Sequence, residues 1–340
     1  MKTPPAAFYN DPARLPLEYQ SVFAHSWQLV GHVSQLAQPG DYFTTRLGHE
    51  PLLFTNDGGT LRGFFNVCRH RAGPIAYGCG RAQRLVCRYH GWTYDLTGQL
   101  LRTTEMDGAT DFDPASIRLR PVALHQFGPL LFAALDPSTP SFDEFFPGVT
   151  KHCAPLHLET MGYVTTREYP VKANWKVYVD NFLEGYHIPL VHPGLNREID
   201  YRKYVTEVSE HHTLQYAPIR EGSEHYGKTA GNDQAFYYWL FPNIMLNIYE
   251  GMMQTNIVIP IDAGNTIVRF DWFAHEPLPD PQTDARFNEL VRFSEEVQAE
   301  DAHICEAVQF NIGSRAYVSG PYSPKRESGV QLFHTLMQKA

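Results

Sequence analysis

The chain has 340 residues, 43% of them apolar and 19% charged, which is long enough for two compact domains and gives no sign of disorder. Its formal net charge of -9 disfavours a nucleic-acid ligand, because binding to phosphate backbones depends on clustered Lys and Arg. The N-terminal residues lack an apolar core of signal-peptide length, and no apolar run is long enough to span a membrane. We therefore expect a cytoplasmic protein that binds neither nucleic acid nor membrane.

The first part of the chain predicts a small all-β domain. From Asp41 to Leu135, short runs of β-forming residues alternate with turn residues, and Asn56-Asp57-Gly58-Gly59 is a typical hairpin sequence. Residues 136–148, DPSTPSFDEFFPG, are rich in Pro, Ser and Asp and mark a domain boundary. We expect one domain over residues 31–136, a second over 137–340, and an N-terminal segment, 1–30, that packs on the second.

The second part predicts an α+β domain with an antiparallel sheet flanked by helices, because strands follow one another in series between helical segments. The predicted elements are a strand near 163–169, a helix over about 174–186, strands at 235–241, 244–249, 254–261 and 266–273, and a long helix over about 282–310.

Two Cys and two His in the first domain have the spacing of an iron–sulfur site. Cys68 and His70 form C-x-H, and after sixteen residues Cys87 and His90 form C-x-x-H. In Rieske [2Fe-2S] centres two imidazoles replace two thiolates on one iron, so each centre needs two Cys and two His. The pattern predicts a Rieske cluster on these four residues.

The alternative for the same residues is a structural zinc site, which also accepts two Cys and two His. Zinc sites commonly pair Cys with Cys and His with His, whereas each loop here supplies one of each. The other thiols, Cys79, Cys153 and Cys305, are expected to be packing residues, since an odd number of cysteines in a large intracellular chain argues against a disulfide framework.

A second metal site is predicted between residues 174 and 192. Asp180, Glu184 and His187 stand at i, i+4 and i+7 and would share one face of a helix. Pro189 would end that helix and let His192 turn back towards His187. Two imidazoles call for one carboxylate to complete the facial triad of an Fe(II) oxygenase.

The third ligand is predicted to be Asp301 in the last long helix, because its neighbours at helical spacing form an apolar face and a buried carboxylate needs a partner. Glu300, His303 and Glu306 are expected on the polar, solvated side. The apolar neighbours are Leu290, Val297, Ile304, Cys305 and Val308.

The motifs CRHRAGP and CRYHGWTYDLTG, and the pattern D-x3-E-x2-H-x4-H followed far downstream by EDAHICEAVQ, resemble the oxygenase components of Rieske non-haem iron oxygenases. The segment AFYYWLFPNIMLNIYEGMMQTNIVIPI looks most like choline monooxygenase and its bacterial relatives. Glu184, where many members carry Asp, is similar to the subset that acts on quaternary amines.

This resemblance implies a 2Fe-2S cluster, a mononuclear Fe(II), a helix-grip-like catalytic domain and a homotrimer. It also implies that Glu184 links the two metals, by accepting hydrogen bonds from its own His187 and from His90 of a neighbouring subunit. Asp180 would support the iron site. No G-x-G-x-x-G motif follows a strand, so a flavin/iron–sulfur reductase is expected to be a separate protein.

Three functions remain open from the sequence. The first is monooxygenation, with O2, of a small choline-, betaine- or carnitine-like quaternary amine, whose cation would bind aromatic rings by cation–π attraction. The second is hydroxylation or demethylation of an aromatic or carboxylated substrate, and the third is electron transfer or zinc binding without catalysis. The aromatic residues considered for substrate binding are Phe182, Tyr216, Tyr238, Trp239 and Tyr249.

Overall fold

The computed structural model describes residues 2–226, 233–249, 251–276 and 278–339. Two compact units make up the chain: Ala24–Thr139, and Met1–Phe23 together with Pro140–Ala340. None of the described helices combines the length and apolar character that crossing a membrane requires.

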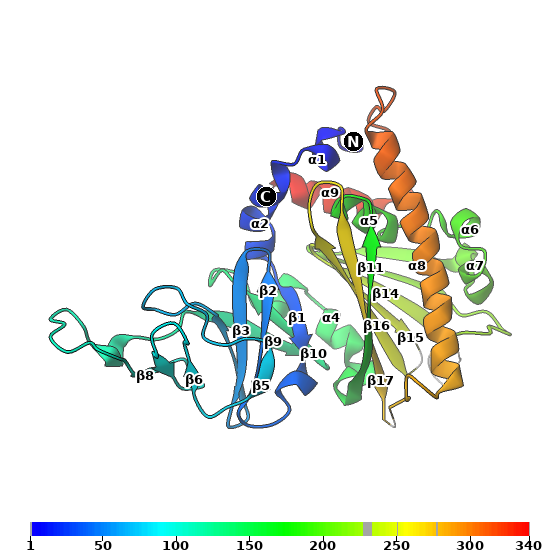
Figure 1. The fold of residues 1–340 in the computed structure, drawn as a ribbon. Coiled ribbons are helices and arrows are strands. Elements are labelled where there is room, and N and C mark those ends of the chain that lie inside the picture. Colours follow the sequence, from blue (N-terminus) through cyan, green and yellow to red (C-terminus); the bar gives the residue numbers. More distant parts are fainter. Residues whose placement is uncertain (1, 227–232, 250, 277, 340) are drawn as a thin grey trace. The chain divides into compact units, whose positions relative to one another are not determined.

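The unit Ala24–Thr139 is all-β, as predicted, and contains a seven-stranded antiparallel sheet and a three-stranded sheet (Figure 1). The large sheet has the order β1-β10-β9-β4-β3-β2-β5 and the small one β6-β7-β8. The strands are β1 (Gln28–His32), β2 (Asp41–Leu47), β3 (Glu50–Asp57), β4 (Thr60–Phe65), β5 (Cys79–Arg81), β6 (Leu85–Val86), β7 (Thr93–Tyr94), β8 (Leu100–Arg102), β9 (Pro121–Phe127) and β10 (Leu130–Ala134).

The predicted hairpin joins β3 to β4. Asp57 pairs with Thr60, and the two residues between them, Gly58 and Gly59, both have positive φ, at +59° and +100°. A two-residue hairpin of this kind needs positive φ at both positions, and glycine adopts it without steric cost. The Asn-Asp-Gly-Gly sequence therefore fixes the register of this pair.

The second unit contains a seven-stranded antiparallel sheet in the order β11-β17-β16-β15-β14-β13-β12, which confirms the predicted α+β class. The strands β12 and β13, at one end of the sheet, were not predicted from the sequence. The strands are β11 (Met161–Val171), β12 (Val205–Val208), β13 (His212–Pro218), β14 (Gln234–Leu240), β15 (Ile244–Tyr249), β16 (Met252–Pro260) and β17 (Thr266–His275).

The long helix α8 runs along this sheet, with α5 and α6 against it (Figure 1). The α-helices are α1 (Ala7–Asn10), α2 (Arg14–Ser21), α3 (Phe142–Phe145), α4 (Val149–Cys153), α5 (Trp175–Phe182), α6 (Ile188–Val191), α7 (Leu195–Glu198), α8 (Ala285–Ile312) and α9 (Ser328–Lys339). Short 3-10 helices cover Phe23–His25, Val33–Leu36, Pro114–Ser116, Ala154–Leu156, Leu158–Thr160 and Tyr201–Lys203.

The N-terminal segment contacts α5 within the second unit. The buried Lys176 ammonium lies 2.6 Å from Glu18 of α2, and the Trp175 indole donates to the same carboxylate at 2.9 Å. A buried ammonium needs such a partner, because an unpaired charge away from water is costly.

The predicted helix over 174–186 is too long. Asn174 caps the start of α5 by accepting from the Lys176 N–H, but α5 ends at Phe182, so Glu184 and His187 do not share a helical face with Asp180. Pro189 lies in the first turn of α6 instead of ending a helix. In a continuous helix Pro189 would lack an N–H for the Gly185 carbonyl and would clash with it, so the chain must break before Pro189.

Candidate metal centres

The two loops that carry the predicted cluster ligands have matching turns. In the first, the Ala72 N–H donates to the Cys68 carbonyl at 3.1 Å and the Cys68 N–H to the Gly73 carbonyl at 2.9 Å. In the second, the Gly91 N–H donates to the Cys87 carbonyl at 2.9 Å. Each turn presents one Cys at its base and one His beyond it.

Of the four predicted cluster ligands, the two thiols are buried and the two imidazoles are more exposed. Cys68 and Cys87 are only 4% and 2% exposed, whereas His70 is exposed and His90 half-buried. The two imidazole rings lie 4.6 Å apart between centroids, and the His70 ring stacks on Trp92. Two inner thiols and two outer imidazoles are what a cluster with one Cys-bound and one His-bound iron requires.

The surroundings of the sulfurs also fit a cluster. Burial raises the pKa of the Cys87 thiol, while backbone N–H groups of Tyr89 and His90 act in the opposite direction. The Tyr94 hydroxyl lies 3.3 Å from Cys68 Sγ. A side chain at Gly73 would come within 2.8 Å of Cys87 Sγ, so only glycine leaves this space open. Donors aimed at sulfur are the usual means by which a protein tunes a bound cluster.

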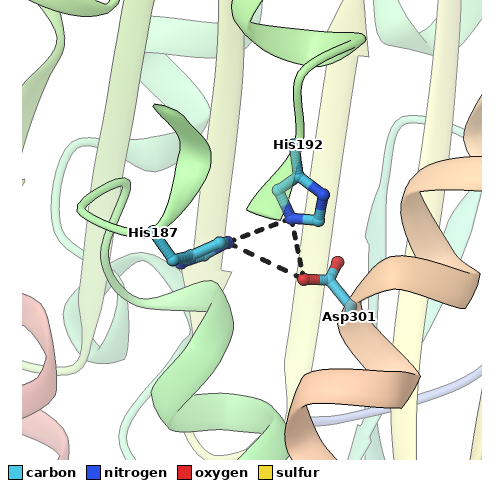
Figure 2. Close-up of side chains that lie close together, drawn as sticks. All are labelled: His187, His192 and Asp301. Atoms are coloured by element: carbon cyan, nitrogen blue, oxygen red, sulfur yellow. Dashed lines mark hydrogen bonds and ion pairs between the residues drawn. The ribbon is translucent and has the colours of Figure 1, made fainter. Parts of the chain in front are cut away.

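In the second unit, His187, His192 and Asp301 bring three donor atoms to one point (Figure 2). The two Nε2 atoms are 3.1 Å apart, and Asp301 Oδ1 lies 2.9 Å from His192 Nε2 and 3.7 Å from His187 Nε2. Metal–nitrogen bonds of about 2.1 Å at right angles separate two donors by about 3 Å. The spacing thus fits one face of an octahedral ion.

The remaining nitrogen of each imidazole is held by a carboxylate. His187 Nδ1 lies 2.7 Å from Glu184 Oε1, and His192 Nδ1 lies 2.6 Å from Glu300 Oε2. Burial disfavours charge on His192, but the hydrogen bonds that its ring donates to Asp301 and Glu300 outweigh burial and raise the pKa of His192. Such outer carboxylates fix the imidazole orientation and direct Nε2 towards the metal.

Placing Glu300 on a solvated face was therefore wrong. Glu306 is also engaged, because its carboxylate accepts from the Lys172 N–H at 3.0 Å, and Val308, expected on the apolar face, is 40% exposed. His303 is exposed, as expected. The helical spacing of apolar residues correctly predicted that Asp301 faces the interior. It could not show that His192, from a distant segment, contacts the adjacent Glu300.

Asp180 does not take the supporting role predicted for it. Among the described residues it bonds Tyr9, whose hydroxyl donates at 2.7 Å, and its Oδ1 lies 2.8 Å from His334 Nε2. Its neighbour Asn181 supports the site instead, with Nδ2 donating to Asp301 Oδ1 at 2.5 Å. Asp180 was predicted because a carboxylate is the usual supporting group at such a site. Near the end of α5, however, the side-chain amide of Asn181 points towards Asp301, and the carboxylate of Asp180 does not.

The bond between Glu300 and His192 gives a first prediction. We expect Glu300→Gln to lower iron affinity by about 10- to 100-fold, the usual effect of losing an outer carboxylate, while cluster absorbance is unchanged. Iron retention during dialysis against a chelator measures this. Glu289→Gln, an exposed change on the same helix, is the matched control. Equal iron retention in both variants would contradict the role of Glu300.

A cavity opens beside the three donor atoms and is lined by α5, the sheet and α8. Two of the aromatic residues proposed for substrate binding, Phe182 and Tyr249, line it. Four lining tyrosines, Tyr178, Tyr204, Tyr226 and Tyr237, were missed. Tyr204 and Tyr226 lie outside the strands, where no periodic pattern indicates which way a side chain points.

The other three aromatic residues do not line this cavity among the described residues, so their proposed role was wrong. Tyr238 bonds His152, because successive strand residues face opposite sides of a sheet and Tyr237 takes the cavity side. Trp239 is fully buried and packs against Phe333. The hydroxyl of Tyr216 donates to Glu207 at 2.9 Å.

Comparison with known proteins assigns a domain family to each of the two parts of the chain. Residues 26–114 match the model of the Rieske [2Fe-2S] domain, and residues 158–340 match the ring hydroxylating alpha subunit (catalytic domain). The chain belongs to the Rieske oxygenase alpha subunits. It is accordingly an oxidoreductase that incorporates O2, with a [2Fe-2S] cluster and a mononuclear iron, for which His187, His192 and Asp301 are the candidate ligands. The iron–sulfur interpretation is confirmed over the zinc alternative.

Individual relatives extend over nearly the whole chain. Choline monooxygenase from Arabidopsis thaliana is 34% identical, covering 98% of this chain and 82% of its own length. The carnitine monooxygenase oxygenase subunit of Escherichia coli K12 is 33% identical, and the match covers 98% of this chain and 92% of the subunit's own length. A solved quaternary ammonium Rieske monooxygenase is 28% identical, with a TM-score of 0.87. The match covers 99% of this chain and 95% of that one. Naphthalene 1,2-dioxygenase from Rhodococcus, at 19% identity and a TM-score of 0.80, shares the fold.

Proposed function

We propose that this Rieske oxygenase monooxygenates a small quaternary amine of the choline, betaine or carnitine type. The proposal rests on three tyrosines that line the cavity and contact one another, Tyr226, Tyr237 and Tyr249, which we call the tyrosine wall. The Tyr226 and Tyr249 rings stack at 4.5 Å between centroids, and Tyr237 meets Tyr249 edge-on at 6.3 Å. Aromatic faces attract a cation that cannot form hydrogen bonds, by about 0.5 to 2 kcal/mol each.

The electrostatics of the cavity support a cationic ligand. Burial raises the pKa of Tyr226, Tyr237 and Tyr249 far above their ordinary value, so these phenols stay neutral. The carboxylate of Glu184 is among the lining groups, while no Lys or Arg is found among the described lining residues. Relatives that act on choline or carnitine support the same substrate class.

In the proposed reaction each unit holds one centre. Cys68, His70, Cys87 and His90 bind the [2Fe-2S] cluster, and a separate flavin/iron–sulfur reductase supplies its electrons. The E. coli relative, named as an oxygenase subunit, supports such a division between proteins. His187, His192 and Asp301 hold the iron, which supplies O2 activation when bound. The tyrosine wall binds the cationic end and so places the substrate beside these ligands.

We further propose that the cooperating centres belong to different subunits of a cyclic homotrimer. His70 is exposed on its own unit, and around Glu184 the second unit exposes Tyr186 and Leu190, at 56% and 90%. Exposed apolar side chains beside a polar group suit a subunit contact. A solved relative is described in terms of inter-subunit electron transfer. Glu184 would then accept from its own His187 and from His90 of the neighbour.

A substrate screen tests the proposed function. With a surrogate reductase and NADH, quaternary amines should stimulate O2 consumption, and benzoate-type aromatic acids should not. Iron and sulfide analysis, expected at about three irons and two sulfides per chain, verifies that the enzyme is loaded. Stimulation by aromatic acids alone would contradict the proposal and favour ring hydroxylation or demethylation.

A further inference from the structure

The loop that brings Tyr226 to the cavity is bonded at both ends to the end of helix α7. At its start, the Arg220 N–H donates to the Glu198 carbonyl at 2.7 Å, and Arg220 Nε donates to the Ile199 carbonyl at 2.7 Å. At its other end, the Tyr226 N–H donates to the Glu198 carboxylate at 3.3 Å. The loop, residues 219–226, therefore closes on Glu198.

The Glu198 side chain is buried, and both of its carboxylate oxygens accept hydrogen bonds from this loop. Oε2 accepts from the Ser223 hydroxyl, from the His225 N–H at 3.0 Å and from the Tyr226 N–H, while Oε1 lies 3.1 Å from His225 Nδ1. Burial acts to raise the pKa of Glu198, but the hydrogen bonds outweigh burial and lower this pKa, so the carboxylate is ionised. Hydrogen bonds to an ionised acceptor are roughly twice as strong as neutral ones.

The backbone that Glu198 holds carries two aromatic rings. The His225 ring stacks on Phe293 of α8 at 4.1 Å between centroids, and the Tyr226 ring meets Phe293 edge-on at 5.8 Å. On its other contact, Tyr226 stacks on Tyr249 of β15 at 4.5 Å. Because the N–H groups of His225 and Tyr226 are both bonded to the carboxylate, the place of the Tyr226 ring in the tyrosine wall depends on Glu198.

Glu198 itself is not among the described residues that line the cavity, so it does not contact a ligand there. It does belong to the segment that begins with a candidate iron ligand. The Asn196 N–H, in the first turn of α7, donates to the His192 carbonyl at 2.9 Å. Residues 192–198 thus carry a candidate iron ligand at one end and, at the other, the carboxylate that holds Tyr226.

We propose that Glu198 is a positioning residue of the tyrosine wall: it holds Tyr226 against Tyr249, and the affinity for a quaternary amine depends on Glu198 through Tyr226. This proposal rests on the proposed function and extends it to a residue outside the cavity. The competing explanation for an effect of Glu198 is direct attraction between its charge and the cation. The two explanations differ in whether Tyr226 is required, which a double-mutant cycle measures.

The test is calorimetric binding to the metal-loaded enzyme under nitrogen, which requires neither O2 nor the reductase. Choline, glycine betaine and L-carnitine are compared first, and the tightest binder of the three is used for the variants. Glu198→Gln, which keeps the shape but not the charge, should weaken this ligand about 10-fold, within the range that one aromatic ring contributes. Glu224→Gln removes an exposed charge from the same loop and is the matched control, expected to stay within about twofold.

The double-mutant cycle then decides how Glu198 acts. Tyr226→Leu alone should weaken the ligand about 10-fold, and adding Glu198→Gln to it should change the affinity by no more than about twofold. A second, independent loss of about 10-fold would show that Glu198 acts without Tyr226 and would overturn the proposal. Unchanged affinity in the single variant Glu198→Gln would overturn it as well.

The variant Ser223→Ala reaches the same contact from the loop side, removes one hydroxyl and changes no charge. It should weaken the ligand about 3- to 5-fold, and this effect should also vanish in the Tyr226→Leu background. If Glu198→Gln does not fold, unchanged affinity in Ser223→Ala overturns the proposal. These results would leave the proposed function standing, whereas an unaltered enzyme that binds none of the three ligands would overturn both.

Discussion

Replacing His187 with Ala is expected to abolish product formation, by at least about 1,000-fold, while the Rieske absorbance is fully retained. The reason is that His187 Nε2 is one of three converging donor atoms at the mononuclear site, whereas the four cluster residues lie in the other unit. A facial triad that loses one ligand retains iron poorly. Iron should fall from about three to about two per chain, as measured by metal analysis beside the visible spectrum.

The complementary change is Cys68→Ala, which should remove the Rieske absorbance and leave the mononuclear iron in place. Cys79→Ala, at an exposed cysteine of the same unit, is the matched control and should keep the full spectrum. Asp301→Ala should behave like His187→Ala. Normal turnover by either of the latter two variants would show that the iron has other ligands.

A mixed oligomer of two inactive variants is expected to recover activity. If the cooperating centres lie in different subunits, Cys68→Ala and His187→Ala supply an intact iron site and an intact cluster to some of the interfaces. Each mixed ring of three has one interface of three in the required order, so the doubly tagged oligomers should recover roughly a third of the unaltered activity. The measurement is turnover by doubly tagged, co-expressed oligomers.

The controls for this experiment are the two variants purified separately and then combined without co-expression. Heterologous contacts close a ring in one direction, so an interface counts only when the cluster-bearing chain precedes the iron-bearing chain. Verified mixed oligomers that remain inactive would rule out transfer between subunits. A Glu184→Gln background should reduce the recovered activity more than it reduces iron content, because Glu184 is proposed to couple the centres.

The sequence was most informative where ligands are close together in the chain. The spacing of Cys68, His70, Cys87 and His90 was enough to predict a Rieske [2Fe-2S] centre, which the family match supports, since two tight turns depend mainly on local residues. His187 and His192 were also paired from the sequence, although the reasoning was wrong: helix α5 ends at Phe182, and the two imidazoles flank the short helix α6.

Contacts between distant segments were not predictable in the same way. Glu300 reaches His192 across 108 positions, and Asn181 reaches Asp301 across 120, so no periodicity within either segment reports them. Tyr226 enters the cavity from a loop held by the buried Glu198, whose carboxylate accepts from the Tyr226 N–H at 3.3 Å. Such contacts depend on tertiary packing and not on local pattern.

The cavity has two kinds of wall, and they can change independently. The candidate iron ligands come from α8 and from the segment around α6 (Figure 2). The lining residues Gln215, Tyr237, Asn247 and Gln254 come from four neighbouring strands. A substitution on a strand alters the side chain on this side of the cavity without moving the backbone of the ligand-bearing helix. During divergence, selection for a new substrate could therefore act on the sheet while oxygen chemistry is preserved.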